Sequence, residues 1–271
     1  MSSSANYPAS INGACVISAD MLPLAFSGFA HFTAMQVRGK KVRGLDLHLA
    51  RLRKASEALF GVALADGQIL EDVGRAINEG SEDLSLTVTL YAPAGEFSAK
   101  SMNAEPAVLI RTGPPSDGPS GPVRLAIVEH ERFLPSIKHV GEGAKTYYLH
   151  RAVEQGFDDA VFKDRSGRLS EGTIWNLVFW DGSAVVWPRA ELLEGTMMAM
   201  IQRQLSRAGI AQRHEDIRPD YLSRFAGAAI MNSWTPGVPV TAIGPDSIPQ
   251  SRHFMDLLHS AYQAEPATAM S

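Results

Sequence analysis

The chain has 271 residues, of which 45% are hydrophobic and 20% charged, and its formal net charge is −4. This is the profile of an ordinary globular protein, and the lack of any basic block excludes an electrostatic binder of nucleic acid or of anionic membranes. With one cysteine, no basic residue before Arg38 and no apolar run near the ~20 residues of a membrane span, we expect a cytoplasmic protein without signal peptide, internal disulfide or membrane partner.

The first part of the chain is predicted to alternate strands and helices. Alternating residues around His31 predict β-structure between Ala14 and Arg38. A helix is expected from Leu45-Asp46, with Asp46 as its N-cap and an inward face spaced at three and four residues. The residues of that face are Leu49, Leu52, Ser56 and Leu59. The other elements expected here are a helix over 66–78 ended by Gly80, and strands over 84–92 and 107–112.

Proline and glycine crowd into residues 113–122, and this density predicts a linker between two domains. We therefore expect an α/β protein with an N-terminal domain over 1–112 and a larger C-terminal domain over 123–271. The elements expected after the linker are strands over 123–133, 158–164, 174–180, 184–188 and 227–234, helices over 144–155, 196–209 and 252–264, a β-like run over 132–137, a two-residue turn at Asp181-Gly182 and a turn at 235–237.

Lys138 follows the apolar run 132–137, and Glu171 follows a predicted strand and turn. Pyridoxal 5′-phosphate needs a lysine that forms a Schiff base with its aldehyde, a group that pairs with its ring nitrogen and donors that hold its phosphate. A carboxylate at the ring nitrogen keeps that nitrogen protonated. We interpret Lys138 and Glu171 as the two catalytic residues of one such site.

The run from Lys138 through a helix to GFDDAVFKDRSGRLSEG and NLVF resembles the class IV aminotransferases, the fold-type IV enzymes that use pyridoxal phosphate. This family includes branched-chain and D-amino-acid aminotransferases and aminodeoxychorismate lyase. The resemblance extends from about Phe32 to Val240. It rests on a strand-end lysine followed by the E-G-x-x-x-N pattern, which Glu171, Gly172 and Asn176 match.

The resemblance implies further cofactor residues and a two-domain fold with the cofactor between the domains. HLARL is similar to the family's arginine helix, which makes Arg51 a phosphate ligand, and LLEG makes Leu193 the residue under the ring. Amides after Gly195 would bind phosphate at a helix N-terminus. The residues placed at the phosphate by these turns are Thr196, Met197, Ser233 and Trp234. A homodimer, in which the partner's N-terminal domain completes the substrate pocket, is also implied.

Some positions depart from the family pattern. The turn after Gly195 carries its hydroxyl one place early, at Thr196, and Gly143 stands where the branched-chain enzymes have a tyrosine. Trp175 and Trp234 replace smaller residues that border the substrate. FTAMQV and Lys138-His139 are more similar to the lyase branch.

The sequence therefore predicts transamination between an amino acid or amine and a keto acid, and leaves two alternatives open. One is a lyase of the aminodeoxychorismate type, and the other is a non-catalytic protein on the same fold. Lys145 is the rival lysine, but GEGAKT lacks the second glycine of a phosphate-binding loop. The histidines show no metal-binding spacing, so no metal is expected.

Overall fold

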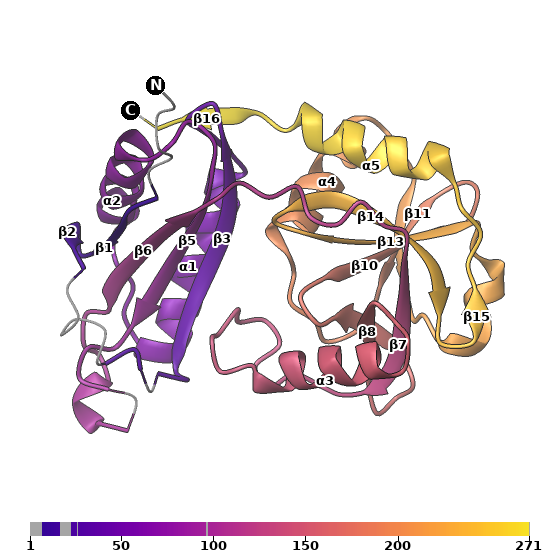
Figure 1. Cartoon of the computed structure of the whole chain (residues 1–271), viewed down its shortest axis with the longest axis horizontal. Coiled ribbons are helices and arrows are strands. Elements are labelled where there is room, and N and C mark those ends of the chain that lie inside the picture. The colour runs from indigo at the N-terminus through magenta and orange to yellow at the C-terminus, as the bar shows by residue number, and fades with distance from the viewer. Residues whose placement is uncertain (1–6, 17–22, 26, 96, 271) are drawn as a thin grey trace. The chain divides into compact units, whose positions relative to one another are not determined.

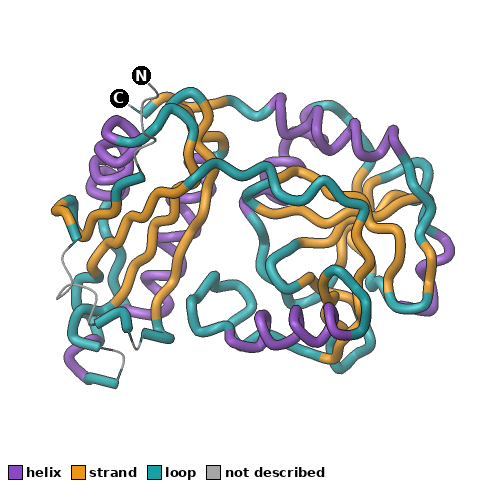
Figure 2. Tube along the Cα trace, in the orientation of Figure 1, coloured by secondary structure: helices purple, strands orange, loops and turns teal. Residues whose placement is uncertain are grey.

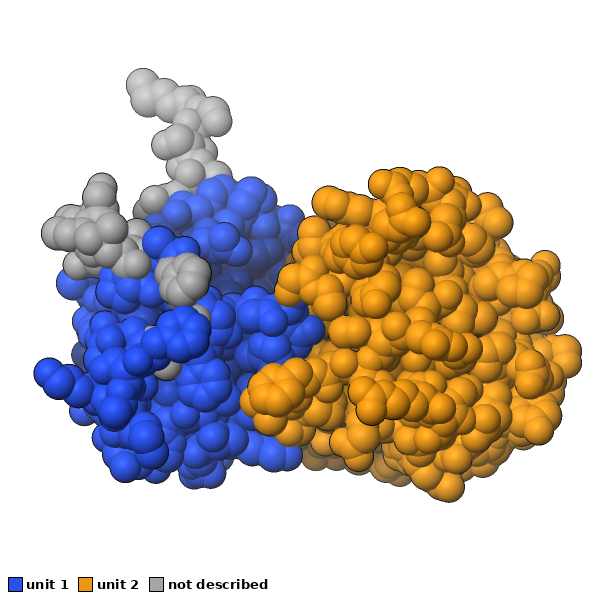
Figure 3. Space-filling model, turned by 90° about the horizontal axis from the view of Figure 1, so that it is seen from below, with its two compact units in different colours: residues 1–116, 137–142, 266–271 blue, residues 117–136, 143–265 orange. Residues whose placement is uncertain are grey.

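The computed structural model describes residues 7–16, 23–25, 27–95 and 97–270. The chain divides into two compact units, which are coloured separately in Figure 3. Unit 1 consists of residues 1–116, 137–142 and 266–271, and unit 2 of residues 117–136 and 143–265. Each unit combines helices and strands, so the predicted α/β class is confirmed.

Unit 1 is built on a seven-stranded sheet with the order β16-β4-β3-β5-β6-β1-β2 (Figure 1). Its strands are β1 (Ala9–Ile11), β2 (Ala14–Cys15), β3 (Ala30–Arg38), β4 (Lys41–Arg43), β5 (Leu84–Tyr91), β6 (Ala107–Gly113) and β16 (Ala267–Ala269). The predicted β-structure of 14–38 is thus two separate strands, and residues 27–29 are not extended. Part of that prediction, 17–22 and residue 26, lies outside the described residues. A 3-10 turn, η2 (Ala99–Ser101), precedes β6.

Two helices of unit 1, α1 (Leu45–Phe60) and α2 (Asp66–Glu79), bury their apolar sides against this sheet. The N-cap of α1 is Gly44, so the prediction of Asp46 as N-cap is wrong. Asp46 lies in the first turn, where its charge still favours the positive end of the helix. Leu52 is buried on the predicted face, whereas Leu49 lies half-buried at its margin.

The contact between β3 and α1 is partly polar. The Nε2 of His31 lies 2.9 Å from Ser56 Oγ, and the Nδ1 of His48 lies 2.6 Å from Thr33 Oγ1. His31 Nδ1 is buried and has no hydrogen-bond partner among the described residues. Burial lowers the pKa of His31 to about 4. Burial, with the charge of Arg51, lowers the pKa of His48 to about 3. Both rings are therefore neutral in the folded protein near pH 7.

These histidines are expected to destabilise the protein in mild acid. The folded pKa of His31 lies below its unfolded value of about 6.5, so its contribution is complete above pH 6.5 and is lost as the pH falls toward 4. At pH 4.5, protonation of His31 alone is expected to lower the free energy of unfolding by about 2–3 kcal/mol. Urea unfolding at pH 7.5 and 4.5 measures it. His31→Leu should reduce the pH dependence, and His150→Gln, at an exposed site on a helix of unit 2, should not.

Unit 2 contains a nine-stranded sheet with the order β12-β11-β10-β13-β14-β7-β8-β9, to which β15 adds beside β14. Its strands are β7 (Val123–Glu129), β8 (Asp159–Lys163), β9 (Leu169–Gly172), β10 (Asn176–Trp180), β11 (Val185–Pro188), β12 (Gln212–Glu215), β13 (Gly227–Asn232), β14 (Thr235–Ile243) and β15 (Asp246–Ser247). Because β9 also pairs with β10, the strands β10-β13-β14-β7-β8-β9 close into a ring. A closed ring has no free edges between its members.

Three helices cover the strands of unit 2: α3 (Gly143–Glu154), α4 (Thr196–Arg207) and α5 (Arg252–Ala264). The predicted helix 252–264 matches α5, whose N-cap Ser251 accepts a hydrogen bond from Phe254 N. The helix α3 packs on β7 and β8, and α4 packs on β12, β13, β14 and α5. A longer 3-10 segment, η3 (Pro219–Arg224), follows β12.

Several local predictions in unit 2 are wrong. The strand β7 ends at Glu129, and the run 132–137 is not extended, because Leu134 has a φ of 51° and Pro135 follows it. The turn predicted at 235–237 is the beginning of β14. Pro236 fits there because the β13–β14 register shifts beside it.

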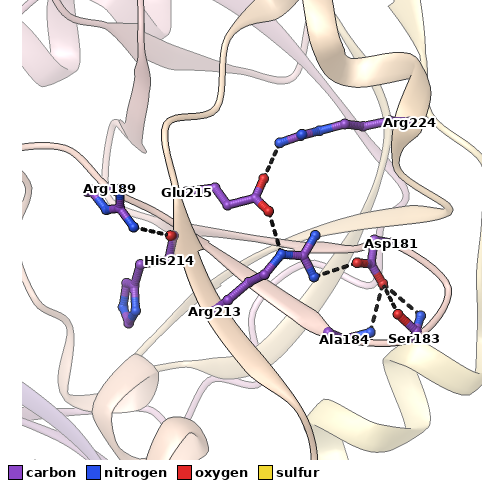
Figure 4. A network of polar contacts seen from close by, with 8 residues as sticks. All are labelled: Asp181, Ser183, Ala184, Arg189, Arg213, His214, Glu215 and Arg224. Atoms are coloured by element: carbon purple, nitrogen blue, oxygen red, sulfur yellow. Dashed lines mark hydrogen bonds and ion pairs between the residues drawn. The ribbon is translucent and has the colours of Figure 1, made fainter.

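The β10–β11 hairpin is present, but its strands are joined by residues 181–184 instead of two residues. The Asp181 carboxylate organises this loop by accepting hydrogen bonds from the amides of Ser183 and Ala184 (Figure 4). Arg213, on β12, links Asp181 to Glu215, which also pairs with Arg224. Although burial acts to raise it, the pKa of Asp181 is lowered by the hydrogen bonds from Ala184, Ser183 and Arg213.

The predicted linker has no regular structure over residues 114–122 (Figure 2), while Gly113 ends β6. It is packed where it joins unit 2. A Cβ on Gly118, which has a φ of 74°, would lie 3.0 Å from Thr235 Cγ2. A glycine is therefore required by both the backbone and the close approach to β14.

Candidate active site

Lys138 belongs to a short extended segment that completes the edge of β3 in unit 1. Phe32 N donates to Lys138 O over 2.9 Å, and Val140 N donates to Ala30 O over 2.8 Å. The Nζ of Lys138 lies 4.8 Å from the centroid of the Phe32 ring. Main-chain bonds at Lys138 and at Val140 thus fix the backbone of this segment, and an aromatic face lies beside the lysine amine.

Arg51 is the second predicted site residue in unit 1. It lies half-buried on α1, one helical turn after His48. The positive charge of Arg51 lowers the pKa of His48. The helix α1, which carries Arg51, is bound to β3 through His48. The segment of Lys138 is bound to the same strand, so both residues belong to one packed part of unit 1.

Glu171 is buried at the end of β9 in unit 2, with 3% of its surface exposed. Its Oε1 lies 3.3 Å from Arg132 Nη1 and accepts a longer hydrogen bond, 3.4 Å, from Leu193 N. Arg132 is also buried, and it donates to Pro135 O over 2.8 Å. The guanidinium compensates the buried carboxylate charge, which would otherwise be costly.

Asn176 connects Glu171 to the turn that precedes α4. The residue pairs directly with Glu171 across β9 and β10, and its Nδ2 donates to Leu193 O over 2.7 Å. A Cβ on Gly195 would lie 2.0 Å from Asn176 Oδ1. Only glycine fits at this position, and the E-G-x-x-x-N pattern and the L-x-G turn are therefore parts of one structure in unit 2.

The predicted phosphate turns of unit 2 lie at the N-terminus of α4 and between β13 and β14. Gly195 is the N-cap of α4, so the amides of the following residues face the end of the helix without partners in its first turn. The Thr196 and Met197 side chains are almost completely buried. Their backbone amides are thus the groups that can serve an anion.

The second phosphate turn consists of Ser233 and Trp234, between the paired residues Asn232 and Thr235. The Trp234 amide donates to Asn232 Oδ1 over 2.9 Å. The Trp234 indole is 38% exposed and meets the Trp175 ring edge-on, with centroids 5.9 Å apart. The Trp234 amide is therefore engaged within the turn, which leaves Ser233 as the turn's candidate for an anion.

Arg132 is the site residue that the sequence did not reveal. It lies in the irregular segment after β7, and no spacing relates it to Glu171. Its only signal was an arginine between Glu131 and Phe133 in a run interpreted as β-like.

The rival lysine, Lys145, lies on α3 in unit 2, whereas Lys138 lies in unit 1. Among the described residues, no cluster of histidine, cysteine and carboxylate side chains could hold a metal ion.

A family model described as amino-transferase class IV matches residues 30–243. The chain belongs to the class IV aminotransferases. This match of the family model confirms the predicted family, its transamination activity and its enzymatic nature. A comparison with curated protein sequences gives no significant match.

Solved structures share the fold of this class IV aminotransferase. A branched-chain aminotransferase from Thermoproteus uzoniensis with norvaline has a TM-score of 0.84 and 18% identity, over 94% of this chain and 93% of that one. The branched-chain aminotransferase of Escherichia coli has a TM-score of 0.81 and 16% identity, over 96% and 94%. A Legionella pneumophila structure described as a 4-amino-4-deoxychorismate lyase has a TM-score of 0.76 and 18% identity, over 89% and 92%.

Enzymes of the class IV aminotransferase family use pyridoxal 5′-phosphate, as predicted for this chain. The residues present fit that group: a lysine with a fixed backbone, a buried carboxylate with a compensating arginine, and a glycine-capped helix N-terminus. None of the helices in the described part of this aminotransferase has the length and apolar character needed to cross a membrane.

Proposed function

We propose that this class IV aminotransferase uses Lys138 and Glu171 as catalytic residues to move an amino group between an amino acid or amine and a keto acid. The observation that carries the proposal is the buried Glu171 carboxylate, held by Arg132 and the Leu193 amide next to the N-terminal turn of α4. A buried carboxylate that an arginine compensates can serve as the partner of a protonated pyridine nitrogen.

When bound, the cofactor supplies an electron sink for the carbanion that forms at the substrate α-carbon. Lys138 Nζ would hold the cofactor at its aldehyde carbon and, as a free amine, would move a proton between the substrate α-carbon and the cofactor's C4′. Glu171 would accept a hydrogen bond from the ring nitrogen and keep the proton there. Leu193 would support the ring, and Asn176 fixes the Leu193 carbonyl.

The phosphate is proposed to be held by one charged side chain and by groups of two turns. Arg51 provides a delocalised charge, while Ser233 and the amides of Thr196 and Met197 provide hydrogen bonds at the turns of unit 2. Trp234 belongs to the same turn as Ser233, and its amide donates a hydrogen bond to Asn232 Oδ1.

Arg51→Ala is expected to weaken cofactor binding more than Ser233→Ala. A lost charged hydrogen bond costs about 1.5–3 kcal/mol and a lost neutral one about 0.5–1.5 kcal/mol. Cofactor dissociation, followed by absorbance in both variants, measures the difference. Arg53→Ala serves as a control, since Arg53 lies on the same helix in an exposed ion pair with Asp66. If Ser233→Ala released the cofactor more readily, the assignment of Arg51 to the phosphate would be wrong.

We also propose the coarser organisation expected from the sequence. Its parts are an N-terminal domain over 1–112, a linker over 113–122 and a C-terminal domain over 123–271, in a cytoplasmic homodimer. The partner's N-terminal domain would complete the substrate pocket.

A lyase reaction of the aminodeoxychorismate type is the second candidate, favoured by FTAMQV and by the Lys138-His139 pair. The Nε2 of His139 lies 3.1 Å from Glu142 Oε1 in the same segment. The two reactions differ in their products. With an amino acid or amine and a keto acid, we expect amine transfer that depends on the acceptor. Pyruvate formed from an aminodeoxychorismate-like substrate without an acceptor would instead establish the lyase.

A further inference from the structure

Asp159 is a buried carboxylate to which the proposed mechanism gives no role. It is the first residue of β8 and 7% exposed. Its Oδ1 accepts hydrogen bonds from Ala160 N over 2.6 Å and from Thr173 Oγ1 over 2.7 Å, and its Oδ2 accepts one from Trp175 Nε1 over 2.8 Å. Burial raises the pKa of Asp159, against the hydrogen bonds from Thr173, Ala160 and Trp175.

The donors to Asp159 come from the turn that joins β9 to β10. Gly172 N donates to Trp175 O over 2.7 Å and closes this turn. Thr173 and Trp175 are buried, whereas Ile174 at the tip is exposed. Asp159 thus binds the two inward side chains of the turn, one with each carboxylate oxygen.

The turn carries the residues of the proposed site at its two ends. Glu171 precedes it and Asn176 follows it, and the two are paired across the strands. Trp175 also leads to the second phosphate turn, because its ring contacts the ring of Trp234 beside Ser233. A shift of the 172–175 turn would therefore displace both the carboxylate and the aromatic contact.

We propose that Asp159 is a positioning residue for cofactor binding, which fixes the 172–175 turn and, through Trp175, the turn that carries Trp234. The proposal rests on the proposed roles of Glu171 and Ser233. Asp159 acts only through Thr173 and Trp175, and it does not contact the cofactor.

Asp159→Asn tests this role with little change of shape. The amide oxygen can still accept from Ala160 N and Thr173 Oγ1, but the amide nitrogen then faces the Trp175 Nε1–H, and two donors meet. Trp175→Phe removes the same hydrogen bond from the other side. Both variants should weaken binding of pyridoxal 5′-phosphate to the apoprotein by about tenfold, and the double variant should be no weaker than either alone.

The readouts separate positioning from general stability. The dissociation constant of pyridoxal 5′-phosphate and the absorption band of the bound cofactor report on the site, while thermal unfolding reports on the fold. Asp158→Asn is the matched control, because the neighbouring Asp158 accepts from Arg124 N over 2.7 Å on another strand. It is expected to leave the dissociation constant and the absorption band unchanged.

Two results would overturn the proposal. In one, Asp159→Asn and Trp175→Phe both bind pyridoxal 5′-phosphate like the wild type, whatever their thermal stability. In the other, their losses in affinity simply add. Failure of the proposed function is a separate outcome, since it would appear in the wild type itself as borohydride labelling that does not occur on Lys138. If Asp159→Asn does not fold, Trp175→Phe alone decides, because it removes the same hydrogen bond without placing a second donor beside the first.

Discussion

Borohydride reduction of the purified protein is expected to attach the cofactor permanently to Lys138, and Lys138→Arg to prevent this attachment. A main-chain bond from Phe32 N ties the Lys138 carbonyl to β3, and the lysine amine lies beside the Phe32 ring. A guanidinium in that place can neither bind the aldehyde nor give up a proton near neutral pH. Turnover should therefore fall by about 10²–10⁴ or more. Peptide mapping of the reduced protein and steady-state rates measure both effects.

Lys145→Arg is the matched control for this experiment. Lys145 is the nearest following lysine in the sequence, and it lies on α3 in unit 2. The variant should keep the label on Lys138 and most of the turnover. A label that appeared on Lys145, or on no lysine, would contradict the assignment of Lys138.

Glu171→Gln is expected to retain the cofactor and to lose about 10²–10³ in turnover. The glutamine oxygen can still accept from Arg132 and from the Leu193 amide, so the turn before α4 should remain in place. The amide cannot hold a proton on the ring nitrogen, however, and the carbanion is then less well stabilised. Single-turnover rates at saturating cofactor separate this effect from weaker binding.

Glu131→Gln provides the control for a change of charge near Arg132. Glu131 is its sequence neighbour, and it pairs with the exposed Arg165 instead of with Arg132. Its turnover should equal that of the wild type. Wild-type turnover in Glu171→Gln itself would mean that another group protonates the ring.

Elements with strong local signals could be predicted from the sequence. The helix α5 has its predicted range, 252–264, which followed from the amphipathic pattern, and the structure adds that Ser251 caps it. The E-G-x-x-x-N pattern likewise placed Glu171 and Asn176, which the structure pairs across two strands. In these cases the neighbours in sequence carry the information.

Features set by distant contacts could not be predicted in this way. Arg132 meets Glu171 only because the segment after β7 folds back, and the short strand Ala267–Ala269 exists only because β4 offers an edge. Pro236 was a turn signal by composition, yet it lies in a strand, at a shift of the β13–β14 register. The pairing of Lys138 with Glu171 in one site remains a prediction, since the two residues belong to different units.

The division of the chain also has a consequence for its synthesis. The sheet of unit 1 contains β4, which ends at Arg43, and β16, which begins at Ala267 and pairs with it. The lysine segment of the same unit is added from residues 137–142. At about 5–20 residues per second, a ribosome needs roughly 10–45 s to pass from the first of these strands to the last. The sheet of unit 1 therefore keeps an incomplete edge until the residues of β16 have been translated.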